Sequence, residues 1–95
     1  MSAEGYKEKG NEEFKKGNYE KAIEFYTYAT EMDPKNHIYM TNRSLCYASM
    51  QKWDKSLRDA DKAVFLKADW EKVHKSSNTI IKRLHTHYLY PSHSD

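Results

Sequence analysis

Two lysines and two asparagines have the side chains and the spacing to hold carboxylate groups: Lys7, Asn11, Asn42 and Lys72. Lys7 and Asn11 are four residues apart, which places them on one face of a helix. Ammonium and side-chain amide groups donate hydrogen bonds, and the terminal aspartate of a peptide brings two carboxylates that need donors. The four residues therefore predict a groove for the acidic carboxyl end of a peptide.

A longer spacing relates the other two residues of this set, Asn42 and Lys72. Asn42 and Ser76 are separated by one full period of an internal repeat, and Lys72 lies four residues before Ser76. Stacked repeats would bring them to equivalent points of adjacent helices. Each lysine alone has a simpler interpretation as a solvated surface residue. The asparagines fit that interpretation less well, because Asn has poor helix propensity.

One constant shift along the chain aligns chemically similar residues: Gly10 with Ser44, Tyr19 with Trp53, Ile23 with Leu57, Ala29 with Ala63, and Pro34 with Ala68. A repeat of this length is typical of helix–turn–helix arrays. We therefore predict an all-α superhelical stack of about two and a half repeats and five helices. Its parts would be repeat one over 3–36, repeat two over 37–70, a half repeat over 71–89 and a flexible tail over 90–95.

Glycine, asparagine and proline predict the ends of the first helices. Gly17 would stop the first helix and Asn18 would cap the second. Pro34 pushes Asp33 out of the helical region and would close the second helix. Gly10 lies within the first helix, where it costs stability, so we expect it to allow close approach of another helix.

The same signals predict the later boundaries. Asn36 would cap the third helix, and a turn at Met50-Gln51-Lys52 would lead to a fourth helix that starts at Trp53. Asp69 would cap a fifth helix that starts at Trp70.

Composition narrows the class of protein. Charged residues make up 32% of the 95 residues and apolar residues 38%, with 3 Gly and 2 Pro, which suits amphipathic helices. The net charge of +2 is too balanced to indicate nucleic-acid binding. Cys46 is the one cysteine, and neither a signal peptide nor a spanning apolar run is visible, so we predict a cytoplasmic protein.

No catalytic or metal site is predicted. His85 and His87 would point to nearly opposite faces of a helix, without a supporting Cys or carboxylate cluster. Cys46 has no activating partner, and no base, nucleophile and orienting group occur together. We therefore expect neither enzyme activity nor a cofactor.

The first repeat resembles the tetratricopeptide repeat family, and the resemblance extends over about residues 3–84. The residues that carry it are Gly10-Asn11, Gly17-Asn18-Tyr19, Lys21-Ala22-Ile23, Phe25-Tyr26, Ala29 and Asp33-Pro34. In the second repeat, Ser56 and Ala68 stand where the family usually has Ala and Pro. The resemblance implies a right-handed stack of helix pairs whose first helices line a concave groove that binds peptides.

Within that family, the segments Lys7–Asn11, Thr41–Ser44 and Asp69–Lys72 are similar to the carboxylate-clamp subclass of heat-shock co-chaperones. The resemblance implies that Lys7, Asn11, Asn42 and Lys72 are clamp residues. It also implies a partner, the C-terminal Glu-Glu-Val-Asp tail of cytosolic heat-shock chaperones of the ninety- or seventy-kilodalton class. Ser76 occupies a fifth clamp position that is often Arg.

Further residues could complete such a groove. Thr79 and Arg83 continue the predicted groove face beyond Ser76, so Arg83 could meet acidic residues upstream of the peptide terminus. Phe14, Leu45 and Ala48 could form an apolar pocket for a valine-like side chain, although Phe14 and Leu45 could equally be core residues.

Two alternatives stay open. The chain could be a scaffold or adaptor that binds another protein's helix or internal segment without needing a free carboxylate. The predicted fifth helix also has an apolar face without obvious cover, which includes Ile80, Ile81, Leu84 and Leu89. That face would imply self-association, packing by the tail, or a chain cut from a larger protein.

Overall fold

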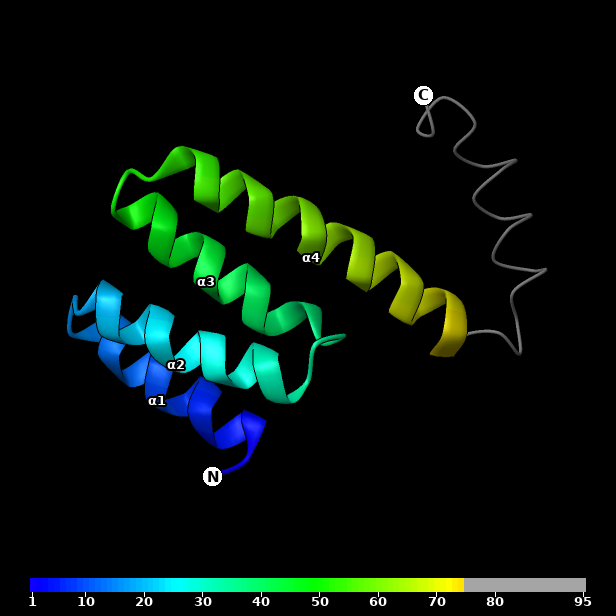
Figure 1. Ribbon diagram of the computed structural model, residues 1–95, viewed down its shortest axis with the longest axis horizontal. Helices are drawn as coiled ribbons and strands as arrows, with labels where there is room; N and C mark the ends of the chain where they lie inside the picture. The colour runs from blue at the N-terminus through cyan, green and yellow to red at the C-terminus, as the bar shows by residue number, and fades with distance from the viewer. Residues whose placement is uncertain (75–95) are drawn as a thin grey trace.

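The computed structural model describes residues 1–74, which form four helices and no strand. The helices are α1 (Ala3–Lys15), α2 (Tyr19–Met32), α3 (His37–Ser49) and α4 (Trp53–His74). Each helix packs against the next one in the chain, so the four form a stack (Figure 1). The all-helical prediction is confirmed. None of these helices combines the length and the apolar character that crossing a membrane requires.

Several predicted helix ends are confirmed. Gly17 has φ = 83°, a left-handed conformation that ends α1 at little cost because glycine has no side chain. The Asn36 side chain caps α3 by accepting a hydrogen bond of 3.0 Å from the backbone nitrogen of Ile38. The turn before α4 is built on Gln51, which also has a positive φ of 61°.

Asn18 is the N-cap residue of α2, as predicted, but its side chain makes no capping hydrogen bond to that helix. Its Nδ2 instead donates to Oε1 of Glu13 at 2.9 Å, while its backbone nitrogen donates to the Glu13 carbonyl oxygen. This hydrogen bond joins the Asn18 side chain to the carboxylate near the end of α1, and it lowers the pKa of Glu13.

The predicted helix boundary at Asp69 is also wrong. α4 continues without a break from Trp53 to His74, so Asp69 lies inside a helix rather than at its start. Pro34 ends the preceding helix pair one period earlier, whereas the corresponding residue here is Ala68, the best helix former. Nothing in the local sequence therefore forces the backbone out of the helix. The rest of the predicted fifth helix lies outside the described residues.

The core of the first repeat is built around Tyr26. Ala22, Tyr26 and Cys46 form a buried cluster, with Phe14 and other partly buried side chains packed against it. A Cβ atom placed on Gly10 would lie 2.6 Å from Cε1 of Tyr26. The prediction that Gly10 permits close approach is thus confirmed, and the group that approaches is an aromatic ring of α2.

The second repeat fills the corresponding space differently. Ser44 and Ser56 replace Gly10 and Ala22 at the positions one period later. The Ser44 hydroxyl donates to the Ser56 carbonyl oxygen at 2.8 Å, and the Ser56 hydroxyl donates to the Ser44 carbonyl oxygen at 3.0 Å. This reciprocal pair joins α3 to α4 and satisfies both hydroxyl groups away from water.

An ion pair connects three of the helices. Arg43 of α3 donates two hydrogen bonds to the Asp59 carboxylate of α4, at 2.7 and 2.9 Å, and a third of 3.0 Å to the Thr27 hydroxyl of α2. The Arg43 and Asp59 side chains are only 17% and 9% exposed. The carboxylate raises the pKa of Arg43, so the guanidinium stays charged. Two-pronged pairing of this kind fixes orientation as well as distance.

Candidate functional site

A small pocket lies where α1, α2 and α3 meet. It has a volume of about 160 Å³ and is lined by Asn11, Phe14, Tyr26, Asn42 and Leu45. Four of these five were predicted as site residues, so the structure brings two amides and two apolar side chains from α1 and α3 into one place. We call this site the amide pocket.

Asn11 is held in position by the core. The Tyr26 hydroxyl donates to Oδ1 of Asn11 at 2.5 Å, which uses the acceptor end of the amide. Burial raises the pKa of Tyr26 to about 12, so the hydroxyl keeps its proton at neutral pH. The Nδ2 group of Asn11 is left to donate to a ligand. From the sequence, Tyr26 was named only among the residues that carry the family resemblance, because its hydrogen bond joins residues from two different helices.

Lys7 lies one helical turn before Asn11 on α1. Its ammonium group is 2.7 Å from Oε2 of Glu4, and its side chain is 22% exposed. The hydrogen bond that Lys7 donates to the Glu4 carboxylate is the main cause that raises the pKa of Lys7, partly opposed by burial, and the nearby Tyr39 hydroxyl of α3 adds to it. Lys7 is therefore a charged donor that already has one carboxylate partner.

Asn42 and Leu45 line the pocket from α3. Asn42 is partly buried, and Leu45 is 54% exposed, so it presents apolar surface at the pocket. Ala48, predicted in the same group, is partly buried on α3 but does not line the amide pocket. Arg43, next to Asn42, is committed to Asp59 and contributes to positioning α3 rather than to the pocket.

The Lys72 backbone belongs to the last turn of α4, and the placement of its side chain lies outside what the structure describes. Ser76, Thr79 and Arg83 lie outside the described residues.

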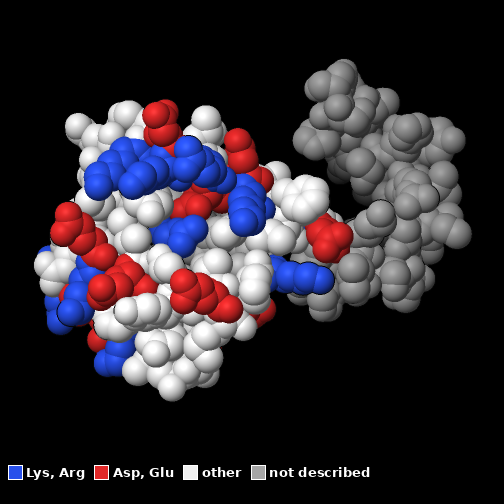
Figure 2. All heavy atoms as spheres, viewed as in Figure 1, with Lys and Arg blue, Asp and Glu red and all other residues white. Residues whose placement is uncertain are grey.

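Basic side chains also gather away from the pocket. On the face shown in Figure 2, a row of Lys and Arg side chains runs over the first half of α4, where Lys55, Arg58 and Lys62 are exposed. Lys55 lies over the ring of Tyr47, 5.8 Å from its centroid. Asp54 and Asp61 are exposed on the same helix, so the row is not a uniformly basic surface.

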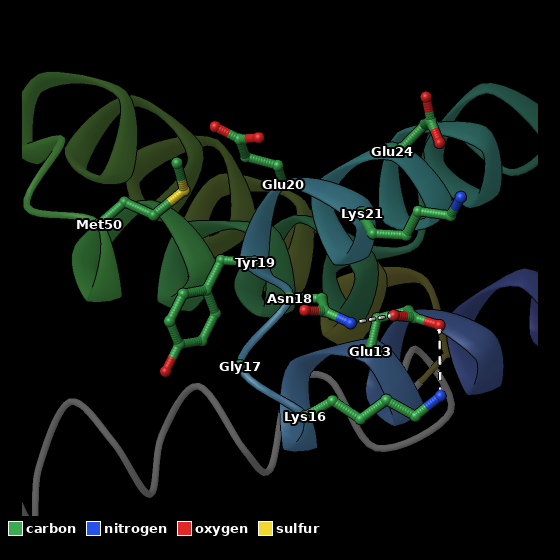
Figure 3. Close-up of a pocket in the computed structure, with 9 residues that line it drawn as sticks. All are labelled: Glu13, Lys16, Gly17, Asn18, Tyr19, Glu20, Lys21, Glu24 and Met50. Atoms are coloured by element: carbon green, nitrogen blue, oxygen red, sulfur yellow. Dashed lines mark hydrogen bonds and ion pairs between the residues drawn. The ribbon is translucent and has the colours of Figure 1, made fainter.

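A larger and more open hollow lies at the turn between α1 and α2 (Figure 3). Its volume is about 930 Å³, and none of the predicted site residues lines it. Three glutamates face this hollow, Glu13, Glu20 and Glu24, and Glu13 is already engaged by Asn18 and Lys16. Lys16 and Lys21 also line the hollow, so its charged side chains sum to −1 rather than to a positive charge. The smaller amide pocket, which is lined by two predicted amide donors, is therefore the better candidate for an acidic ligand.

Among residues 1–74, the structure shows neither a metal site nor a reactive thiol. No group of three or more His, Cys, Asp or Glu side chains in this part of the chain is arranged to hold a metal ion. Cys46 is fully buried, and burial raises the pKa of its thiol to about 11, which keeps it in the unreactive protonated form.

Comparison with known proteins gives a consistent picture. Residues 3–36 match the tetratricopeptide repeat family. Over 70 residues, 74% of this chain, the sequence is 47% identical to the heat shock protein sti1 homolog of Schizosaccharomyces pombe. Over a stretch of the same length it is 41% identical to Hsp70-Hsp90 organizing protein 2 of Arabidopsis thaliana. The matched stretch spans 12% of each of these relatives.

Two solved structures are similar in both fold and sequence. One is the first TPR of Spaghetti (RPAP3) bound to the HSP90 peptide SRMEEVD, with a TM-score of 0.70 and 32% identity, and the match covers 87% of this chain and 70% of that one. The other is the second TPR of the same protein with the same peptide, with a TM-score of 0.70 and 31% identity over 88% of this chain and 81% of that one.

Proposed function

Because the chain belongs to the tetratricopeptide repeat family, we propose that it is a protein-interaction module whose amide pocket binds the carboxyl end of an acidic peptide. The observation that carries the proposal is the convergence of Asn11 and Asn42 on one pocket, with the acceptor of Asn11 already engaged by Tyr26. The HSP90 peptide in two similar structures supports a chaperone tail of the Glu-Glu-Val-Asp type as the ligand.

Each side chain has a defined part in this mechanism. Asn11 and Asn42 donate amide hydrogen bonds to the terminal carboxylates, and Lys7 supplies a positive charge one turn away. Phe14 and Leu45 provide the apolar wall for a valine-like side chain. Lys72 is the proposed second cation, which would pair with the other carboxylate of the terminal aspartate.

The proposal extends to residues beyond the amide pocket. Ser76 occupies the neutral fifth position, and Thr79 and Arg83 continue the groove toward upstream acidic residues of the peptide. Residues 71–89, of which 71–74 belong to the last turn of α4, would complete a half repeat, giving two and a half repeats and five helices, with 90–95 as a tail. The module would work in the cytoplasm as part of a co-chaperone of ninety- or seventy-kilodalton chaperones, without enzyme activity of its own.

The decisive experiment compares two peptides that differ at one group. A Glu-Glu-Val-Asp peptide with a free carboxyl end and its C-terminally amidated twin are titrated calorimetrically into the protein. We expect the free acid to bind at least about tenfold more tightly, since a charge-assisted hydrogen bond contributes roughly 1.5–3 kcal/mol when partly desolvated. Lys7→Ala and Lys72→Ala are each expected to lower that affinity by a similar factor.

Equal affinity for the two peptides would contradict the proposal. It would favour an adaptor that recognises an internal segment or a helix, with no need of a free carboxylate. The exposed apolar side chains of α4, Trp53, Leu57 and Val64, are the observation that keeps this second function open.

A further inference from the structure

We infer that Tyr26 is a positioning residue that sets the orientation of the Asn11 amide for binding a carboxylate. The inference rests on the proposed function and adds a residue that does not itself need to touch the peptide. Its basis is the hydrogen bond from the Tyr26 hydroxyl to Oδ1 of Asn11, at 2.5 Å, on the border of the amide pocket.

The two ends of an asparagine amide have opposite hydrogen-bonding properties. Nδ2 donates and suits a carboxylate, whereas Oδ1 accepts and would repel one. A freely rotating amide presents either end. Since the Tyr26 hydroxyl donates to Oδ1, it selects the orientation in which both Nδ2 hydrogens remain for a ligand. No other hydrogen bond engages Asn11 within residues 1–74.

Tyr26 is itself unable to move away. It is 2% exposed and belongs to the buried cluster with Ala22 and Cys46. Its ring lies so close to Gly10 that a Cβ there would be 2.6 Å from Cε1. The hydroxyl group is therefore fixed by the core, and the amide is fixed by the hydroxyl. This arrangement reduces the rotational entropy that Asn11 loses when a ligand binds.

The second repeat has no equivalent of the tyrosine–asparagine pair. At the positions one period later, Tyr26 corresponds to Ala60 and Asn11 corresponds to Leu45. The same two helix faces meet there without any polar pair at those positions, and the fold is kept. The tyrosine–asparagine pair is thus a feature of the first repeat, which supplies Lys7 and Asn11 of the proposed carboxylate donors.

A double-mutant cycle tests the inference by measuring the affinity for the free-acid Glu-Glu-Val-Asp peptide. Tyr26→Phe keeps the ring and removes the hydroxyl, and we expect it to weaken binding about three- to tenfold. Asn11→Ala should weaken binding at least as much. In the Asn11→Ala background, Tyr26→Phe should have no further effect, because Tyr26 acts through Asn11.

Tyr28→Phe is the matched control, since Tyr28 is 41% exposed and does not line the pocket. It should leave the affinity unchanged, and helical circular dichroism should show all four variants folded. Unchanged affinity in Tyr26→Phe, or losses that add in the double variant, would overturn the inference. Failure of the proposed function is distinguishable, because the unmodified protein would then bind the free-acid and amidated peptides equally.

Discussion

The missing side chain of Gly10 makes room for the ring of Tyr26. We expect Gly10→Ala to lower the free energy of unfolding by about 1–2 kcal/mol, because the clash with a buried ring outweighs the better helix propensity of alanine. Gly5→Ala is the control: its Cβ would first meet the flexible side chain of Met1, with Cγ at 2.7 Å. Urea denaturation should show Gly5→Ala unchanged or more stable, and equal destabilisation of both variants would contradict the argument.

The ion pair between Glu4 and Lys7 should limit the affinity for the peptide. Glu4 holds the Lys7 ammonium at 2.7 Å and would have to release it to an incoming carboxylate. Glu4→Gln should therefore tighten binding of the free-acid peptide about two- to fivefold, which is the range expected for an exposed ion pair. The same change should lower the pKa of Lys7, whose largest upward contribution comes from Glu4.

Glu12→Gln provides the control for net charge, since Glu12 is exposed on the same helix. Calorimetric titration of both variants at low salt separates the two effects. If Glu12→Gln tightened binding as much as Glu4→Gln, the gain would come from the overall charge of α1 rather than from release of Lys7.

The sequence predicted where helices end, but it did not predict the side-chain contacts between helices. Local signals placed the ends of α1, α2 and α3 correctly, because Gly17, Asp33-Pro34 and Asn36 act on their own backbone. Asn18 begins α2 as predicted, but its side chain donates to Glu13 of α1 instead of capping α2, which local signals do not specify. The hydrogen bond of Tyr26 with Asn11 and the pairing of Arg43 with Asp59 depend on how helices meet, which periodicity does not specify.

At the scale of the elements, the α2–α3–α4 arrangement depends on Arg43 and Asp59. Asp59→Ala leaves a guanidinium group that is 17% exposed without its carboxylate, so we expect a loss of about 3 kcal/mol in the free energy of unfolding. Asp61→Ala removes an exposed carboxylate from the same helix and should change the free energy of unfolding by less than about 0.5 kcal/mol. Chemical denaturation compares the two, and equal effects would mean that the pair contributes no more than an exposed charge.

A second result at the scale of the elements is that α4 continues past Asp69 without a break. Pro34 and Ala68 are repeat-equivalent, and only the proline forbids a continuous helix. Asp69 has the side chain of a helix-start signal, but an exposed aspartate is also tolerated inside a helix. A capping residue without a helix breaker before it was therefore insufficient evidence for a boundary.

In the whole stack, two repeat-equivalent helix surfaces differ in exposure: the one on α2 is covered and the one on α4 is exposed. The α2 residues Tyr19 and Ile23 are partly buried and pack against the core. Their repeat equivalents on α4, Trp53 and Leu57, are each 62% exposed. The difference arises because α3 covers α2, and within residues 1–74 no helix follows α4 in the stack.

This asymmetry predicts unequal costs for matched substitutions. Ile23→Ser should lower the free energy of unfolding by about 2 kcal/mol, since it removes a packed apolar side chain, whereas Leu57→Ser should cost less than about 0.5 kcal/mol. Thermal unfolding is measured for both variants at several protein concentrations. Equal losses would mean that the α4 surface is covered in solution. A melting temperature of the unmodified protein that rises with concentration, and no longer does so in Leu57→Ser, would identify a second copy of the chain as the cover.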